Sequence, residues 1–255
     1  MQTVALPGLN LELKDHGNGP PLLFLDAGEG VAPNRDWLPL LARHFRVIAP
    51  VHPGWGRDEL PDWMAGTDDL AYLYLDLAEA LDLRDAVLIG AGFGGWIAAE
   101  MAVRDPRRFA RMVLAAPLGI KLGGVLDRDI LDMHALDPDA LAARAWADPR
   151  RGEIDFTAMA ADDLAAVARG RESLLVFGWK PYMHNPRLHR WLHRAQLPTL
   201  LLWGEADRVV TPAYGAGWRG LLPDARLEVI ADAGHFPHWE QPARFAERVS
   251  AFAGR

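Results

Sequence analysis

Short hydrophobic runs alternate with amphipathic segments along most of the chain. Runs rich in Val, Ile, Leu and Phe, bounded by Gly, Pro or Asp, predict strands at 21–26, 45–50, 85–90, 111–117, 198–204 and 225–231. Several are apolar at nearly every position, as expected for strands covered on both faces. Apolar residues at helical spacing predict helices at 67–83 and 94–105, and segments near 2–6 and 9–15 predict antiparallel edge strands.

This alternation of strands and helices predicts an α/β fold with a mostly parallel sheet of about eight strands and helices on both faces. The alternation stops between 118 and 194, where helical patterns are separated by Pro and Gly, and strands resume at 198. We therefore expect one domain over 1–255 with a helical lid at 118–194, inserted between two core strands. The alternative is that these helices only pack against the core.

Composition narrows the function classes. The chain has 255 residues, half of them apolar, a net charge of −7 and no cysteine, which excludes disulfides and thiolate metal sites. Basic residues are scattered, so no nucleic-acid surface is expected. No apolar run approaches a membrane span, and the first residues lack a basic start followed by an apolar run. These features favour a cytoplasmic protein that binds neither membranes nor nucleic acid.

The stretch "IGAGFGGW" at 89–96 lies between a predicted strand and a predicted helix. This is the setting of a nucleophile elbow, whose pattern is Gly-x-Ser-x-Gly. Here Gly92 occupies the position of the reactive serine, and it has no side chain to serve as a nucleophile.

Two further residues follow the plan of such an enzyme. Asp207 comes just after the predicted strand 198–204, and His235 lies in the loop after the strand 225–231. Nucleophile position, acid and base therefore occur in the chain order of this scaffold.

With these motifs in order, the chain resembles a lid-bearing, cofactor-independent α/β-hydrolase. The matching segments are "PLLFLDAGEG", "FRVIAPVHPGWGR", "LIGAGFGGWIAAEMA", "LLWGEADRVVTP" and "AGHFPHWEQP". The resemblance implies that Asp207 and His235 are the acid and base of a triad. It also implies an oxyanion hole made by the backbone N–H of Phe93 and an N–H near Ala27 or Gly28. No cofactor and no metal are expected.

The departures from this family are as informative as the matches. Gly92 replaces the serine, Asp26 stands where a His-Gly pair usually begins, and Val51 stands where Asp is frequent. Gly92 is either a serine-to-glycine replacement made to inactivate the protein or a native divergence. Because other signature positions also differ, we favour native divergence.

Asp26 follows the apolar strand 21–26 and is expected near the floor of the pocket. There it could donate or accept a proton, or it could instead cap nearby backbone amides. The remaining candidates for the substrate pocket are Glu29, His52, Trp96, Lys121 and His238, each of which has a plain structural alternative.

Three functions remain open. The first is acid–base chemistry by His235 and Asp207 on a small, largely apolar carbonyl- or ester-type substrate, without an acyl-enzyme. It covers lyase, isomerase, cyclase and decarboxylase reactions and water-mediated hydrolysis. The second is a serine hydrolase of esters or C–C bonds seen as an inactivated variant. The third is a binding protein that has kept the pocket and lost catalysis.

Overall fold

The computed structural model describes residues 1–28, 37–124 and 126–254. Its strands form an eight-stranded sheet in the order β1-β2-β4-β3-β5-β6-β7-β8. The bounds are β1 Gln2–Leu6, β2 Leu9–His16, β3 Pro21–Leu25, β4 Arg46–Pro50, β5 Ala86–Ala91, β6 Phe109–Ala115, β7 Thr199–Gly204 and β8 Ala225–Ile230. β1 and β2 are antiparallel at one edge, and from β4 to β8 all neighbours are parallel. The predicted fold class is confirmed.

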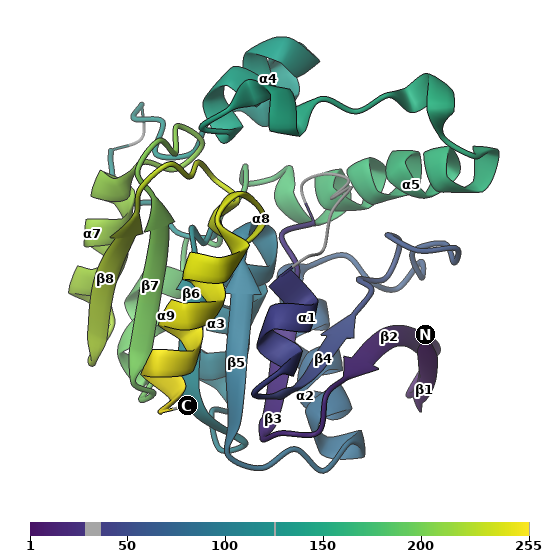
Figure 1. Cartoon of the computed structure of the whole chain (residues 1–255), viewed down its shortest axis with the longest axis vertical. Coiled ribbons are helices and arrows are strands. Elements are labelled where there is room, and N and C mark those ends of the chain that lie inside the picture. The colour runs from purple at the N-terminus through teal and green to yellow at the C-terminus, as the bar shows by residue number, and fades with distance from the viewer. Residues whose placement is uncertain (29–36, 125, 255) are drawn as a thin grey trace.

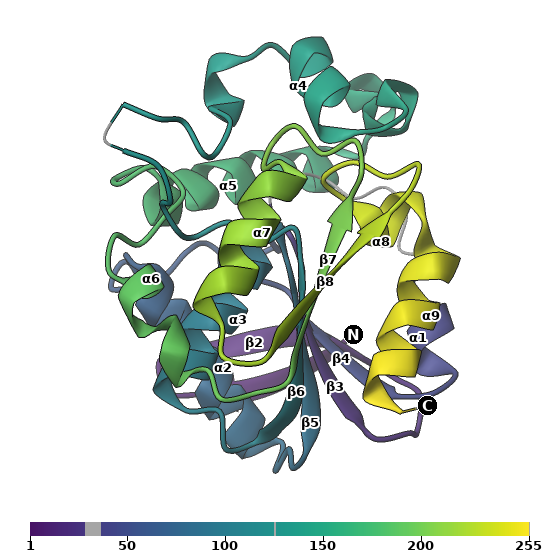
Figure 2. The ribbon, with the colours of Figure 1, turned by 90° about the vertical axis from the view of Figure 1, so that its left-hand side faces the viewer.

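Helices cover both faces of this sheet (Figures 1 and 2). The α-helices are α1 Trp37–Ala42, α2 Thr67–Ala80, α3 Gly92–Arg104, α4 Pro138–Ala145, α5 Ala161–Gly178, α6 Leu188–Trp191, α7 Pro212–Leu221, α8 Pro237–Glu240 and α9 Pro242–Ala253. The 3₁₀ helices are η1 Met133–Ala135, η2 Pro149–Gly152, η3 Phe156–Ala158 and η4 Leu192–Arg194. α1 and α9 lie on one face, and α2, α3 and α7 lie on the other (Figure 2).

The continuous hydrophobic runs belong to the most buried elements. β5 and β7 are buried at every position, and α3 is buried from Gly92 to Val103. Because both faces of β5 are covered by helices, a polar side chain on either face would lose its hydration without gaining a partner. This burial explains why the strand–helix core could be recognised from the sequence.

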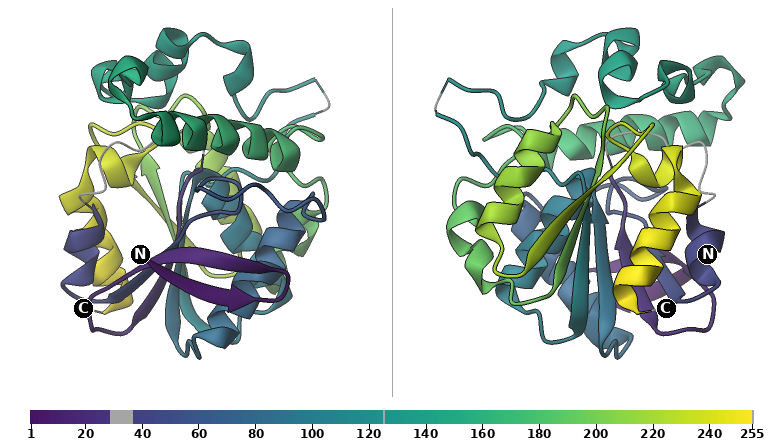
Figure 3. Two further views of the ribbon diagram at one scale, coloured as in Figure 1. Left: turned by 90° about the vertical axis from the view of Figure 1, so that its right-hand side faces the viewer. Right: turned by 60° about the vertical axis from the view of Figure 1, so that its left-hand side comes forward.

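The segment between β6 and β7 contains η1, α4, η2, η3, α5, α6 and η4. α4 and α5 lie above the carboxyl ends of the parallel strands, and Figure 3 shows them across the same end from two sides. Hydrogen bonds join the end of α4 to the loops after β7 and β8: Arg208 N–H donates to the Arg144 carbonyl (3.1 Å) and His235 N–H to that of Ala145 (2.6 Å). The helical segment therefore rests on the end of the sheet where α/β proteins bind ligands.

Candidate active site

The turn between β5 and α3 has the backbone of a nucleophile elbow. Gly92 has φ of +47°, a region that glycine enters without strain, while Ala91 before it is extended. Two neighbouring glycines are required for close packing. A Cβ on Gly94 would lie 2.3 Å from the carbonyl oxygens of Leu25 and Asp26, and one on Gly90 would lie 2.3 Å from the Gly94 carbonyl. The elbow is thus packed directly against the end of β3.

Asp207 and His235 form a buried pair. His235 Nδ1 lies 2.9 Å from Asp207 Oδ2, and both side chains are 0% exposed. The other oxygen, Asp207 Oδ1, accepts the backbone N–H groups of Val209 (2.8 Å) and Val210 (3.1 Å). Because the carboxylate accepts a hydrogen bond from Nδ1–H, the neutral imidazole presents Nε2 as its basic nitrogen. The pair therefore has the geometry of a general base held in one tautomer.

The backbone groups expected to form an oxyanion hole are bonded to each other. The Phe93 N–H donates to the Ala27 carbonyl at 3.2 Å. A carbonyl and the following N–H of one planar trans peptide point in opposite directions, so this contact turns the Gly28 N–H away from Phe93. Phe93 and Ala27 thus lie together, but in this conformation Phe93, Ala27 and Gly28 do not present two converging donors.

Hydrogen bonds on both sides hold this loop in place. His52 Nε2 lies 2.9 Å from the Asp26 carbonyl, and Trp55 Nε1 donates to the Gly28 carbonyl at 2.7 Å. His52 Nδ1 lies 2.5 Å from the Tyr74 hydroxyl, and burial raises the pKa of Tyr74 well above its usual value, so the phenol stays protonated. His52, a candidate for the pocket, therefore supports the loop after β3.

Asp26 lies between the elbow and a second histidine. Its Oδ1 accepts the N–H of Ala27 (2.8 Å) and lies 3.8 Å from His238 Nε2. His238 is fully buried, and this burial lowers its pKa, so its ring is neutral at pH 7. Rings of Phe24, Trp239 and Phe245 surround the His238 ring at centroid distances of 4.8–5.8 Å. The structure thus places an Asp–His contact beside the Asp207–His235 pair.

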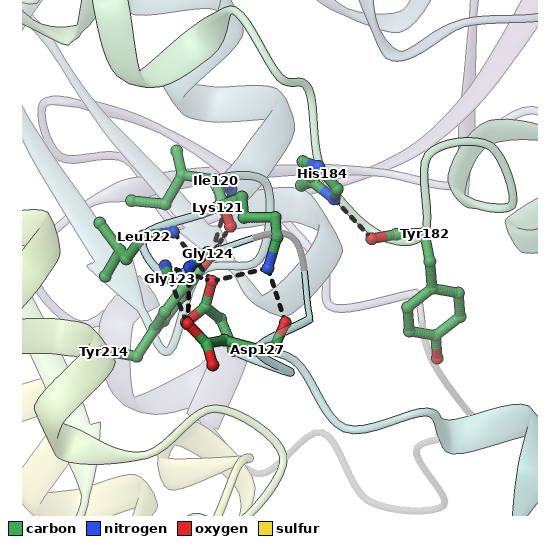
Figure 4. A network of polar contacts seen from close by, with 10 residues as sticks. Ile120, Lys121, Leu122, Gly123, Gly124, Asp127, Tyr182, His184 and Tyr214 are labelled. Atoms are coloured by element: carbon green, nitrogen blue, oxygen red, sulfur yellow. Dashed lines mark hydrogen bonds and ion pairs between the residues drawn. The ribbon is translucent and has the colours of Figure 1, made fainter.

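The other sequence candidates lie elsewhere. Trp96 donates Nε1–H to Glu100 (3.1 Å) and lines a cavity on the α2–α3 side of the sheet. Lys121 Nζ donates to the Asp127 carbonyl (2.6 Å) and lies 3.5 Å from Asp129, in a loop network with Tyr214 (Figure 4). Glu29 lies outside the described residues.

A chamber lies beneath α4, and its lining includes Phe236, the residue after His235, but not His235, Asp207 or Gly92. It has a volume of about 710 Å³ and is bordered by the stacked rings of Phe236 and Trp239. Phe236 also contacts the His235 ring, with centroids 5.0 Å apart. Other lining residues come from the segment 133–156 and from α5, and the apolar ones include Met133, Leu136, Leu141, Ile154, Phe156 and Leu174. The lining also contains two cations, Arg151 and Arg171, and three carboxylates, Asp139, Glu153 and Asp155. The Arg171 guanidinium lies 5.4 Å from the Phe156 ring centre.

Sequence reasoning missed Glu240, five residues after His235. Its buried carboxylate accepts the N–H of Gly234 and, at 2.8 Å, that of Ala147. Burial raises the pKa of this carboxyl group. Glu240 therefore links the loop that contains His235 to the chain just after α4. The available signal was a single acidic residue at the end of the aromatic and histidine-rich stretch "HFPHWE".

Comparison with known proteins fits this geometry. The family model described as "Alpha/beta hydrolase family" matches residues 16–248. The chain belongs to the alpha/beta hydrolase family. Among curated members, it is 29% identical to the 2-hydroxymuconate semialdehyde hydrolase of Pseudomonas sp. (strain CF600), over 96% of this chain and 90% of that protein. It is also 26% identical to the 2-hydroxy-6-oxo-2,4-heptadienoate hydrolase of Pseudomonas putida, over 96% and 93%.

Solved structures of alpha/beta hydrolases share the fold. The meta-cleavage product hydrolase from Pseudomonas fluorescens IP01 aligns with a TM-score of 0.79 at 22% identity, covering 100% of this chain and 97% of that one. In this member of the family, no helix of the described residues is long and apolar enough to cross a membrane. Nor do the described residues contain a cluster of three or more His, Cys, Asp or Glu side chains suited to a metal ion.

Proposed function

We propose that this protein is a cofactor-independent enzyme that moves protons on a small, largely apolar carbonyl- or ester-type substrate without forming an acyl-enzyme. The observation that carries this proposal is the buried Asp207–His235 pair in a chain whose elbow residue is glycine. His235 Nε2 would take a proton from the substrate or from a water molecule, while Asp207 stabilises the resulting imidazolium. Lyase, isomerase and cyclase reactions and water-mediated hydrolysis can begin with such a step. In a decarboxylation, CO₂ leaves first, and the protonated His235 would then donate a proton to the resulting enolate.

The chamber beneath α4 supports the choice of substrate. Its apolar walls suit a small carbon skeleton, and its few charged side chains, of both signs, offer polar partners to a carbonyl oxygen or an enol. The names of the two Pseudomonas relatives describe conjugated compounds that carry aldehyde or oxo groups. Hydrogens next to such groups are acidic, so we take an enolisable carbonyl compound as the substrate class. In this proposal the 118–194 segment acts as a lid that keeps water from the chamber.

A bound oxyanion would require the loop after β3 to change. As long as the Ala27 carbonyl accepts the Phe93 N–H, that donor is occupied. Rotation of the Ala27–Gly28 peptide would release the Phe93 N–H and turn the Gly28 N–H toward it. Gly28 has φ of +69° and is free to adopt either backbone orientation. We therefore propose that Phe93 and Gly28 stabilise an enolate only after the substrate has displaced this carbonyl.

Hydrogen exchange tests proton transfer without knowledge of the natural substrate. Incubated in D₂O, the protein is expected to speed the replacement of C–H by C–D next to the carbonyl of 2-oxobutanoate or acetylacetone. The exchange is followed by proton NMR, with heat-denatured protein as the control. Exchange no faster than this control for both compounds would contradict the proposal.

Asp26 is proposed as a second proton carrier. Its carboxylate lies at the carboxyl end of β3, which pairs with β5, so both strands end at the elbow. Two titratable groups in different surroundings can divide acid and base roles.

The variant Asp26→Asn keeps an oxygen for the Ala27 N–H but loses the charge. It is expected to lower the exchange rate by about 10²-fold and to remove one limb of the pH–rate profile. The rate is measured across pH 5–9, and circular dichroism checks the fold. An unchanged pH profile would make Asp26 a structural residue.

The alternative of a serine hydrolase is favoured by one observation, the positive φ of Gly92 in a chain that keeps the buried Asp207–His235 pair. In that case the natural residue at this position is serine. A binding protein without activity is the remaining alternative, and the unaltered protein would then bind ligands without turnover.

A further inference from the structure

We propose that a cavity on the α2–α3 side of the sheet is a second ligand site, which binds an organic anion with an aromatic or apolar body. The cavity has a volume of about 670 Å³, within the range of small-molecule pockets. It lies between the first turn of α2, the outer face of α3 and the chain from the end of α5 to η4, elements that Figure 2 shows on one face. Neither Asp207 nor His235 lines it.

The charge of the cavity favours an anion. Its lining contains four cationic residues, Arg104, Lys180, Arg187 and Arg194, and two acidic ones, Asp68 and Glu100. Glu100 is buried and forms an ion pair with Arg104, so its charge is compensated within the protein. Lys180 and Arg187, in the chain between α5 and α6, are exposed. On a chain with a net charge of −7, this local excess of positive charge would attract a small anion.

The apolar part of the lining suits a flat ring. Trp96 and Phe177 are buried in the wall, while Trp191 and Val176 are about half exposed at the rim. Exposed tryptophan beside cationic side chains can contact both the ring and the charged group of one ligand. The combination therefore favours an aromatic carboxylate or a similar anion over a bare inorganic ion.

The floor of the cavity is rigid before any ligand binds. Glu100 Oε1 accepts the Trp96 Nε1–H (3.1 Å) and the Asn185 Nδ2–H (2.8 Å). These contacts fix the indole on α3 and tie α3 to the chain that follows α5. Little conformational entropy would therefore be lost from this wall when a ligand binds, and this pre-organisation increases the affinity.

One layer of rings separates this cavity from the elbow. Phe93, which follows Gly92, lies 5.9 Å from the rings of both Trp96 and Phe177, centroid to centroid. The chamber beneath α4 has a different lining, which includes Phe236 and Trp239. The two sites can therefore be tested independently.

Calorimetric titration with 1-naphthoate and its uncharged analogue 1-naphthamide tests the site. The naphthoate is expected to bind at least tenfold more tightly than the amide. This advantage should shrink between 20 mM and 500 mM NaCl, because salt screens interactions between exposed charges. Equal affinities for the two compounds would overturn the proposal.

Matched variants locate the binding. Lys180→Gln/Arg187→Gln removes two cations of the cavity and is expected to raise the Kd for naphthoate about tenfold. Arg43→Gln/Arg219→Gln removes two exposed cations outside the cavity and should change the Kd less than twofold. An equal effect of the two double variants would overturn the site.

Two single variants distinguish this cavity from the chamber beneath α4. Trp191→Ala, at the exposed rim, is expected to weaken binding of both naphthoate and naphthamide, because each loses the same ring contact. Arg171→Gln should leave the naphthoate affinity unchanged. If Arg171→Gln weakens binding and Trp191→Ala does not, the probe occupies the chamber and the proposal is wrong.

Discussion

Replacing Gly92 with serine is expected to raise the hydrolysis of p-nitrophenyl acetate about 10²-fold above that of the unaltered protein. A complete triad contributes on the order of 10⁴–10⁶ in rate, and each missing oxyanion donor costs about 10²–10³. The serine would meet the Asp207–His235 pair, but the Phe93 N–H is occupied by the Ala27 carbonyl. The expected gain is therefore clear but partial, and acetylated protein should accumulate in intact-mass spectra.

The double variant Gly92→Ser/His235→Ala is the matched control and should return to background, because the hydroxyl then has no base. Gly92→Ala reports the cost of placing a side chain at positive φ, about 1–2 kcal/mol in the free energy of unfolding. If a folded Gly92→Ser variant shows neither adduct nor esterase activity while carbonyl exchange persists, the scaffold serves other chemistry. In that case the serine hydrolase alternative is wrong.

Replacing His235 with alanine is expected to slow the carbonyl exchange reaction about 10³-fold, since general-base catalysis contributes 10²–10⁴. Asp207→Asn should have a similar effect, because an amide cannot stabilise the imidazolium and favours the wrong tautomer. The rates are measured by the NMR assay in D₂O, with ligand binding followed in parallel by calorimetry.

His193, an exposed histidine in η4, provides the matched control, and His193→Ala should leave the exchange rate unchanged. Exchange that persists in His235→Ala would show that another group, with Asp26 the first to examine, removes the proton. If binding persists in the unaltered protein and in His235→Ala, with turnover in neither, the binding-protein alternative holds.

The sequence by itself determined the sheet and the order of the site residues. Strands such as 85–90 and 198–204 are apolar at nearly every position because helices cover both of their faces. Burial on both faces therefore appears in the sequence as a short, continuous hydrophobic run. The placement of Asp207 and His235 after successive strands followed from the same pattern, because parallel strands end at one edge of the sheet.

Only the tertiary structure decided what each remaining candidate contacts. Trp96 is on the predicted helix, but the docking of the chain after α5 makes it the wall of a separate cavity. The Ala27 carbonyl meets the Phe93 N–H because β3 and the elbow approach closely, although 66 positions separate them in the sequence. Glu240 joins two segments 93 residues apart. Such contacts depend on how packed elements meet and on the direction of single peptides, and neither leaves a periodic signal in the sequence.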